Sequence, residues 1–181
     1  MKRWTLLKRW TLVVSVLLHS VLLVVVFLLQ DTVFPFLKLY GLVPLLLPIV
    51  STGVAVYEGS VAGGSVGIFA GVLCDISFNR PVGTFTVLLT FAGLFVGALA
   101  DTVMARGFVT YCISCAAVLA VSAFTQMFPL MFFERVPPMP LLVAALRQTI
   151  YSLIYTVPIW FFVRALGNRA QRVRESKKQQ K

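Results

Sequence analysis

Two short stretches of the chain repeat one pattern of small residues and end in an aspartate. GIFAGVLCD runs from Gly67 to Asp75 and GLFVGALAD from Gly93 to Asp101, and five of nine residues match across a shift of 26. Two carboxylates form a catalytic pair when they lie a few ångströms apart, because one then holds the other protonated. The repeat is therefore either an aspartyl active site or a helix-packing motif that ends in a carboxylate.

The other reactive side chains are few and lie in apolar surroundings. His19 falls near the middle of a long apolar stretch, where a polar group is costly unless it is functional or bonded to a nearby Ser or Thr. Cys112 and Cys115 form a C-x-x-C, and with Cys74 they are the three cysteines of the chain. A metal site would need a second pair or nearby histidines. We expect packing roles, no metal, no cofactor and no enzymatic activity, since motifs for phosphate loops and nucleophile elbows are also missing from the sequence.

The composition is that of a membrane protein. The 181 residues are 59% hydrophobic and 12% charged, and the mean hydropathy is +0.93, whereas a soluble domain has about 25% charged residues. Only helices or closed barrels satisfy their backbone in lipid, and the apolar runs here are too continuous for alternating strands. The sequence therefore predicts an all-α integral membrane protein.

Six apolar stretches approach the length that a membrane-spanning helix needs, about 17–25 residues. The first lacks a small-residue cleavage site and is expected to be a retained signal-anchor. A basic tail over 169–181 follows the membrane domain of residues 1–168. The predicted spans are 10–29, 42–57, 61–76, 83–100, 108–133 and 139–166.

The basic residues predict the orientation, because Lys and Arg are retained on the cytoplasmic side during insertion. With six spans, twelve of them fall on the face that holds both termini and three fall on the other face. Both termini are therefore predicted to be cytoplasmic. The net charge of +10 then faces anionic lipids of the inner leaflet, and this topological role makes a nucleic-acid partner unnecessary.

Helical spacing favours the packing interpretation of the repeat. Gly63, Gly67, Gly71 and Asp75 follow one another at steps of four and form one ridge of a helix, and Gly93, Gly97 and Asp101 form the same ridge on the next. Small residues at this spacing let helices approach closely in lipid. Consecutive spans are antiparallel, so the two aspartates are predicted to lie about 30 Å apart, which excludes a paired-carboxylate site.

Arg147 lies deep inside the last predicted span, whereas Arg164 falls near the end of that span. If that span begins at Met139, the guanidinium lies about 12 Å into it, where an unpaired charge is costly. Either the span begins near Arg147, or Arg147 pairs with an outer carboxylate such as Asp75 or Glu134. We expect a partnered or snorkelling arginine.

One spaced frame resembles a known family. Gly67-x3-Gly71-x3-Asp75-x7-Gly83, together with the loop QDTVFPFLKLYGLVP and the basic tail after IWFFVRALGNR, is similar to the bacterial rod shape-determining protein MreD. The resemblance implies a multi-pass protein of the bacterial cytoplasmic membrane that acts in the elongation machinery of the lateral cell wall. The implied partners are the bitopic protein MreC, the actin-like MreB, and the wall polymerase and transpeptidase.

A chain with so little mass outside the membrane is expected to act by docking. The candidate contacts with an MreC-like partner are aromatic and proline residues of two outer loops, because these offer contact area at low entropy cost. They are Phe34, Phe36, Tyr40, Pro137 and Pro138.

The alternative is the substrate-binding subunit of an energy-coupling-factor vitamin transporter, which resembles this chain in span number and length. Such subunits dock through small residues in the first span. The corresponding stretch here, TLVVSVLLHSVLLVVVFLL, contains neither Ala nor Gly. A vitamin retained on purification would favour this alternative.

Overall fold

The computed structural model describes residues 2–32, 43–78, 83–102, 107–133 and 137–165, and their side chains except those of residues 2–15 and 129–133. All the secondary structure in these ranges is helical. The predicted all-α class is therefore confirmed. The helices are α1 Lys2–Thr32, α2 Leu46–Glu58, α3 Ser60–Ser77, α4 Thr84–Thr102, α5 Phe108–Phe133 and α6 Pro138–Ile154, followed by the helix Thr156–Ala165.

A proline explains the break after α6. The helix Thr156–Ala165 is bent by 45° from α6, and the bend falls at Tyr155, three residues before Pro158. Pro158 has no amide hydrogen, and its ring crowds the carbonyl four positions earlier, that of Ile154. The last predicted span is therefore two helical segments rather than one straight helix.

Three helices, α3, α4 and most of α5, are long and apolar enough to cross a membrane, and α6 with its bent continuation makes a fourth. The apolar part of α1, Val16–Thr32, has 17 residues and α2 has 13, about 20 Å at 1.5 Å per residue. The helix in the predicted second span therefore starts four residues later than the predicted boundary and is short for a membrane crossing. The long apolar helices are those of a membrane-embedded protein, while six spans and cytoplasmic termini stay predictions.

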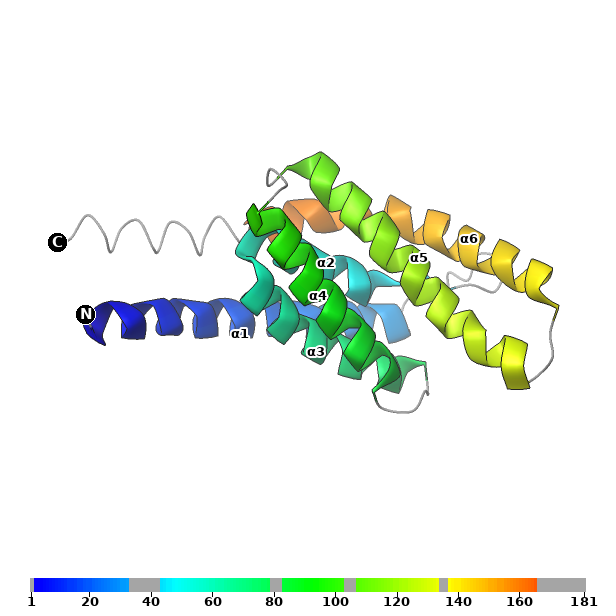
Figure 1. Cartoon of the computed structure of the whole chain (residues 1–181), viewed down its shortest axis with the longest axis horizontal. Coiled ribbons are helices and arrows are strands. Elements are labelled where there is room, and N and C mark those ends of the chain that lie inside the picture. Colours follow the sequence, from blue (N-terminus) through cyan, green and yellow to red (C-terminus); the bar gives the residue numbers. More distant parts are fainter. Residues whose placement is uncertain (1, 33–42, 79–82, 103–106, 134–136, 166–181) are drawn as a thin grey trace.

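Consecutive helices run in opposite directions (Figure 1). We call the end of the bundle at which α1 and α3 finish the distal end, and the end at which α2 and α4 finish the proximal end. The first residues of α1 and the last of Thr156–Ala165 lie toward the proximal end (Figure 1).

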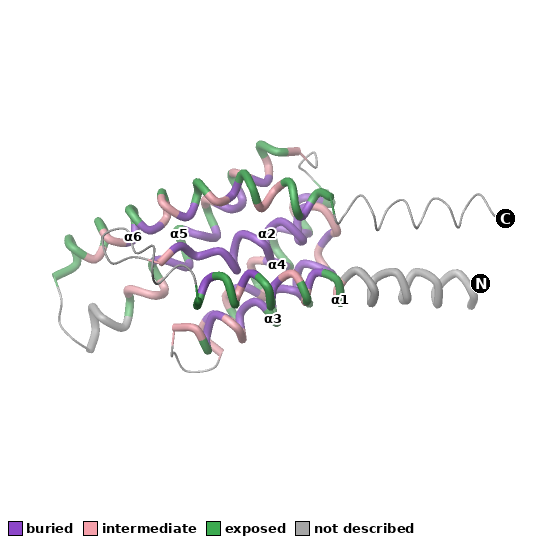
Figure 2. Tube along the Cα trace, turned by 180° about the vertical axis from the view of Figure 1, so that it is seen from behind, coloured by how far each residue is buried: buried purple, intermediate pink, exposed green. Residues whose placement is uncertain are grey.

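The short helix α2 forms the centre of the bundle. Every residue from Leu46 to Val56 is buried, and Figure 2 shows α2 as the most continuously buried element. The surrounding helices expose large apolar side chains outward, among them Phe91, Phe95 and Phe161. An apolar interior combined with an apolar exterior is the pattern of a helical bundle in lipid.

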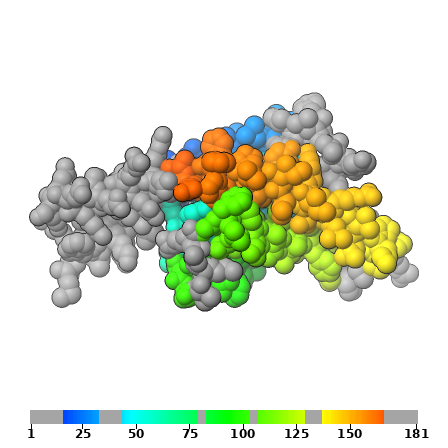
Figure 3. Space-filling view, turned by 90° about the horizontal axis from the view of Figure 1, so that it is seen from above, coloured from blue at the N-terminus to red at the C-terminus, as the bar shows by residue number. Residues whose placement is uncertain are grey.

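Helix lengths separate two parts of the bundle. α3 and α4 have 18 and 19 residues, about 27–29 Å, which matches a hydrocarbon core of about 30 Å. α5 has 26 residues, about 39 Å. Its last turns and the first turns of α6 extend past the distal ends of the other helices (Figure 1), and α6 runs along one face of the molecule (Figure 3).

Candidate functional site

The Asp75 carboxylate caps the start of α4. Asp75 is 1% exposed, and its Oδ1 accepts a hydrogen bond from the Phe85 amide at 2.8 Å. Its Oδ2 accepts from the amide of Gly83 at 2.8 Å and from the amide and hydroxyl of Thr86. The first amides of a helix have no partner within the helix, and the helix dipole favours an anion there. The buried charge is thus held by the neighbouring helix.

Gly83 makes this cap possible. Its φ is +119°, a conformation that residues with a Cβ rarely adopt, and it lies immediately before α4. An added Cβ would meet nothing within 4 Å. The backbone conformation, not crowding, therefore explains glycine at this position.

The glycines of the two ridges lie at the contact between α3 and α4, which is the most extensive helix pair of the described bundle. A Cβ added to Gly67 would overlap the Leu89 carbonyl, and one added to Gly71 would overlap the Thr86 backbone. A Cβ on Gly63 would stand 2.8 Å from the Gly93 carbonyl oxygen. The two backbones touch, as the small-residue spacing predicts for helices that pack in lipid.

The contact repeats with the same shift of 26 residues as the sequence. Gly67 lies on Leu89 and, 26 residues later, Gly93 lies on Gly63. Gly71 lies on Thr86, and correspondingly Gly97 lies on Ser60. Adding 26 to the α3 residue of a contact and subtracting 26 from its α4 partner therefore gives another contact of the same pair of helices. α3 and α4 thus form an antiparallel hairpin with internal two-fold pseudosymmetry.

The aspartates obey this symmetry. Asp75 accepts a hydrogen bond from the amide of Phe85. The residue 26 positions before Phe85 is Gly59, and Asp101 lies against it: a Cβ added to Gly59 would stand 2.8 Å from Asp101 Oδ2. Gly59 has a φ of +93° and precedes α3. The carboxylates therefore lie at opposite ends of α4, about 24 Å apart along its axis, which is incompatible with a catalytic pair.

The start of α2 is buried and is capped by side chains of other helices. The amide of Leu46 donates to Gln30 Oε1 of α1 at 3.0 Å, and the amide of Leu45 donates to Ser152 Oγ of α6 at 2.9 Å. Gln148 Nε2 donates to the carbonyl of Val43 at 3.0 Å. These bonds place Gln148 and Ser152 level with the distal end of α1. Sequence reasoning missed this network, whose only signal is polar residues within apolar stretches.

Arg147 is exposed on the outward face of α6, beside the exposed side chains of Leu146 and Ile150. Of the two carboxylates suggested as its partner, Asp75 does not pair with it, because that carboxylate is bonded to residues 83–86 instead. Glu134 lies outside the described residues. Since Gln148 is level with the end of α1, the guanidinium lies near the distal end of the membrane-length helices, where it can reach lipid headgroups.

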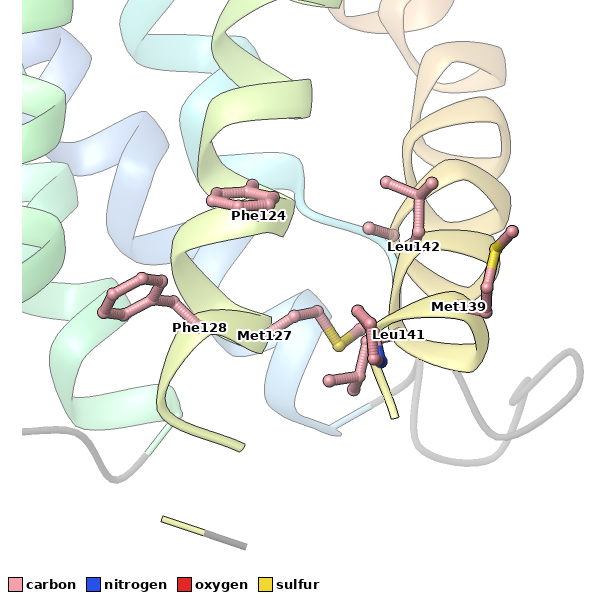
Figure 4. A pocket seen from close by; sticks show the side chains of 8 residues that line it. Phe124, Met127, Phe128, Met139, Leu141 and Leu142 are labelled. Carbon is pink, nitrogen blue, oxygen red and sulfur yellow. The ribbon is translucent and has the colours of Figure 1, made fainter. Parts of the chain in front are cut away.

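An apolar groove of about 300 Å³ lies between the projecting parts of α5 and α6. Figure 4 shows Met127 of α5 and Leu141 of α6 pointing toward one another between the two helices, whereas Phe128 points away from α6 and Met139 lies on the far side of α6. No lining residue is polar, and the lining is completed by Phe124, Pro138, Leu142 and Ala145. Met139 is 73% exposed and Phe128 is 49% exposed, so the groove opens to the surroundings.

The predicted partner contacts are partly described. Pro137 precedes α6 and Pro138 is its first residue, a position where the missing proline amide would lack a partner anyway. Both are exposed, and Pro138 lines the groove. Phe34, Phe36 and Tyr40 lie outside the described residues, as does the basic tail 169–181.

A pair of buried ionisable side chains joins α1 to α2. His19 Nδ1 lies 3.6 Å from Glu58 Oε1, and the two side chains are 2% and 6% exposed. From the sequence, His19 is expected to be either functional or bonded to a nearby Ser or Thr. In the structure, a carboxylate lies beside it. Glu58 was missed because it falls just after the predicted second span.

The cysteines make no site in the described part of the chain. Cys74, Cys112 and Cys115 are free thiols, and none of the described His, Cys, Asp and Glu residues form a group of three that could hold a metal. Cys115 Sγ lies 4.0 Å from the carbonyl oxygen of Ile49, which places it in the packed contact between α5 and α2.

Comparison of the chain with protein-family models, with curated proteins and with solved structures finds no match.

Proposed function

We propose that the chain is a non-enzymatic membrane scaffold of the bacterial cell-wall elongation machinery, with a role like that of MreD. It would maintain cell shape by docking with an MreC-like bitopic protein in the cytoplasmic membrane. Through that partner it would connect to an MreB-like actin and to the wall polymerase and transpeptidase.

The observation that carries the proposal is the geometry of the frame on which the resemblance rests. Gly71, Asp75 and Gly83 are spread over a stretch in which the first and last are twelve residues apart, yet all three act on one feature, the start of α4. Gly71 lets Thr86 approach, Asp75 accepts hydrogen bonds from the amides of Gly83, Phe85 and Thr86, and Gly83 supplies the positive φ. A frame with one shared structural task is less easily reached by chance than scattered glycines, which supports the resemblance.

The α5–α6 groove is the described surface that best suits docking. It is lined by aromatic, methionine and leucine side chains, and these supply contact area that can adapt to a partner helix. It also includes Pro138, one of the predicted contacts. The tail 169–181 is expected to face anionic lipids rather than to bind the partner.

Depletion of the protein followed by microscopy tests the function. Loss of rod or oval shape is the expected result, because an elongation scaffold is needed for lateral wall synthesis. Unchanged shape on full depletion, or a vitamin requirement in its place, would overturn the proposal in favour of the transporter alternative.

Cysteine crosslinking tests the partner. We expect crosslinks to an MreC-like protein from groove positions such as Met139 and Leu142, and few from the tail. Phe91 and Phe95 on α4, which are similarly exposed, are the controls. Crosslinks confined to the tail, or purification with no MreC-like protein, would contradict docking in this form.

A further inference from the structure

Several buried polar groups gather where α2 begins, and some of their hydrogen-bonding atoms have no partner. Gln30 Nε2, Gln148 Oε1 and Ser122 Oγ are buried and make no hydrogen bond, and the three side chains are 1%, 3% and 0% exposed. Buried polar atoms are nearly always bonded to protein or to ordered water, and an orphan costs about 1–3 kcal/mol. Three orphans in one region therefore point to an occupant.

The orientation of the two glutamine amides is fixed by the backbone. Gln30 accepts from the Leu46 amide, so its oxygen must face that amide and its NH₂ group is the atom left over. Gln148 donates to the Val43 carbonyl, so its NH₂ group is used and its oxygen is left over. Exchanging oxygen and nitrogen in either side chain would break an existing bond without removing an orphan.

The rise of α5 places Ser122 at the level of this region. Cys115, seven residues earlier on the same face of α5, lies against the Ile49 carbonyl of α2. Seven residues advance a helix by about 10 Å, which carries Ser122 distally past the start of α2 to the level of residues 43–46. We call Gln30, Ser122, Gln148 and Ser152 the distal polar site.

The unpaired groups define the chemistry of the occupant. They comprise one NH₂ donor, one carbonyl acceptor and one hydroxyl that can do either. The start of α2 adds little attraction for an anion, because the amides of Leu45 and Leu46 are already bonded and Pro48 has no amide hydrogen. A neutral oxygen that both donates and accepts satisfies all three groups.

We propose that the distal polar site binds a neutral hydroxyl group, supplied by ordered water or by a small hydroxylated molecule. The site lies at the start of a helix whose first residues are buried among α1, α5 and α6, so the occupant completes the hydrogen bonding that holds this discontinuity inside the bundle. This role is independent of the proposed scaffold function, and either can fail without the other.

Radiolytic hydroxyl labelling of the purified full-length protein tests for water. Water held at the site produces radicals beside Leu45, Leu46 and Leu47, although these side chains are almost wholly buried. We expect their oxidation to exceed that of Val66 of α3 and Leu89 of α4, which are equally buried, by about fivefold, since ordered water gathers at buried polar groups and apolar packing stays dry. The combined variant Ser122→Ala and Gln148→Leu should remove the excess.

Native mass spectrometry separates the two sources of the hydroxyl. A retained small molecule that is lost in the double variant identifies a hydroxylated ligand, and labelling without a retained mass identifies water. Oxidation of Leu45–Leu47 equal to that of Val66 and Leu89, with no retained mass, overturns the proposal. An excess that persists in a folded double variant overturns it as well, because the radicals then do not originate at these groups. If the double variant does not fold, Ser122→Ala alone, which removes one hydroxyl, gives the same comparison with a smaller expected decrease.

Discussion

The amide of Phe85 donates a 2.8 Å hydrogen bond to the carboxylate of Asp75, ten residues earlier at the end of the preceding helix. This bond joins the last turn of α3 to the first turn of α4 and fixes how the two helices meet. Because Asp101 stands in the equivalent place beside Gly59, the hairpin has a carboxylate at each end. The first of these is buried and the second is exposed, and this difference makes their roles separable.

Removing the buried carboxylate should destabilise the fold more than removing the exposed one. Asp75→Ala leaves the amides of Gly83, Phe85 and Thr86 without this acceptor, and we expect a loss of about 2 kcal/mol or more. Asp75→Asn keeps one acceptor oxygen and should lose less. Thermal unfolding in detergent measures the difference. Asp101→Ala is the matched control and should cost about 0.5–1 kcal/mol; equal effects at the two positions would show that the cap on α4 is not what matters.

Two glycines of α3 should differ in how strongly the same small substitution affects the amount of folded protein. A Cβ at Gly71 would overlap the Thr86 backbone, whereas one at Gly64 would meet the end of the Leu94 side chain, 2.7 Å away. Backbone cannot yield without separating the helices, but a side-chain end can rotate. We therefore expect Gly71→Ala to lower the amount of folded protein several-fold and Gly64→Ala to change it little, as measured by size-exclusion chromatography. Normal accumulation of Gly71→Leu would contradict the close contact altogether.

The cap on α2 predicts a large effect from a one-atom deletion. Ser152→Ala removes the acceptor for the buried Leu45 amide, and an unsatisfied buried amide costs about 1–3 kcal/mol. Ser65→Ala also removes a hydroxyl, but that hydroxyl is exposed and bonds only to its own helix, so we expect less than about 0.5 kcal/mol. Unfolding midpoints of the two variants in the same detergent provide the comparison, and similar midpoints would argue against the cap.

His19 and Glu58 should be energetically coupled. Their 3.6 Å contact predicts that the effects of His19→Phe and Glu58→Gln on unfolding free energy will not add, with an interaction of about 0.5–3 kcal/mol. A double-mutant cycle in detergent measures this quantity. A second cycle with substitutions at His19 and Thr102, which lie on helices that do not share this contact, is the control, and its two effects on unfolding free energy should add. Additivity at His19 and Glu58 would mean that the two side chains stabilise the protein separately.

The predicted topology can be tested directly in cells. Reporter tags at both termini should report cytoplasm, and tags in SFNRPV and ERVPPMP should report the opposite side, because with six spans twelve of the basic residues would fall on the face that holds both termini. Protection of single cysteines from a membrane-impermeant reagent provides a second measurement. Labelling of a cysteine at the C-terminus from outside would refute an even number of crossings.

The sequence by itself indicated that the chain is embedded in lipid, that it is helical, and which glycines form a packing ridge. Long apolar stretches form helices because backbone groups in lipid must pair within the segment, and this requirement is local. The spacing of Gly63, Gly67 and Gly71 places them on one face because a helix has 3.6 residues per turn. The separation of Asp75 from Asp101 follows in turn from the antiparallel order of neighbouring helices.

Only the tertiary structure decided which side chains meet across the bundle. Ser152 caps Leu45 from 107 residues away, Glu58 rather than a hydroxyl lies beside His19, and Arg147 faces outward instead of pairing with Asp75. α2 also proved short, because polar groups of α1 and α6 can satisfy a helix start inside the bundle. Such contacts depend on how far each helix is rotated and shifted against its neighbours, and periodicity within one segment does not set either quantity.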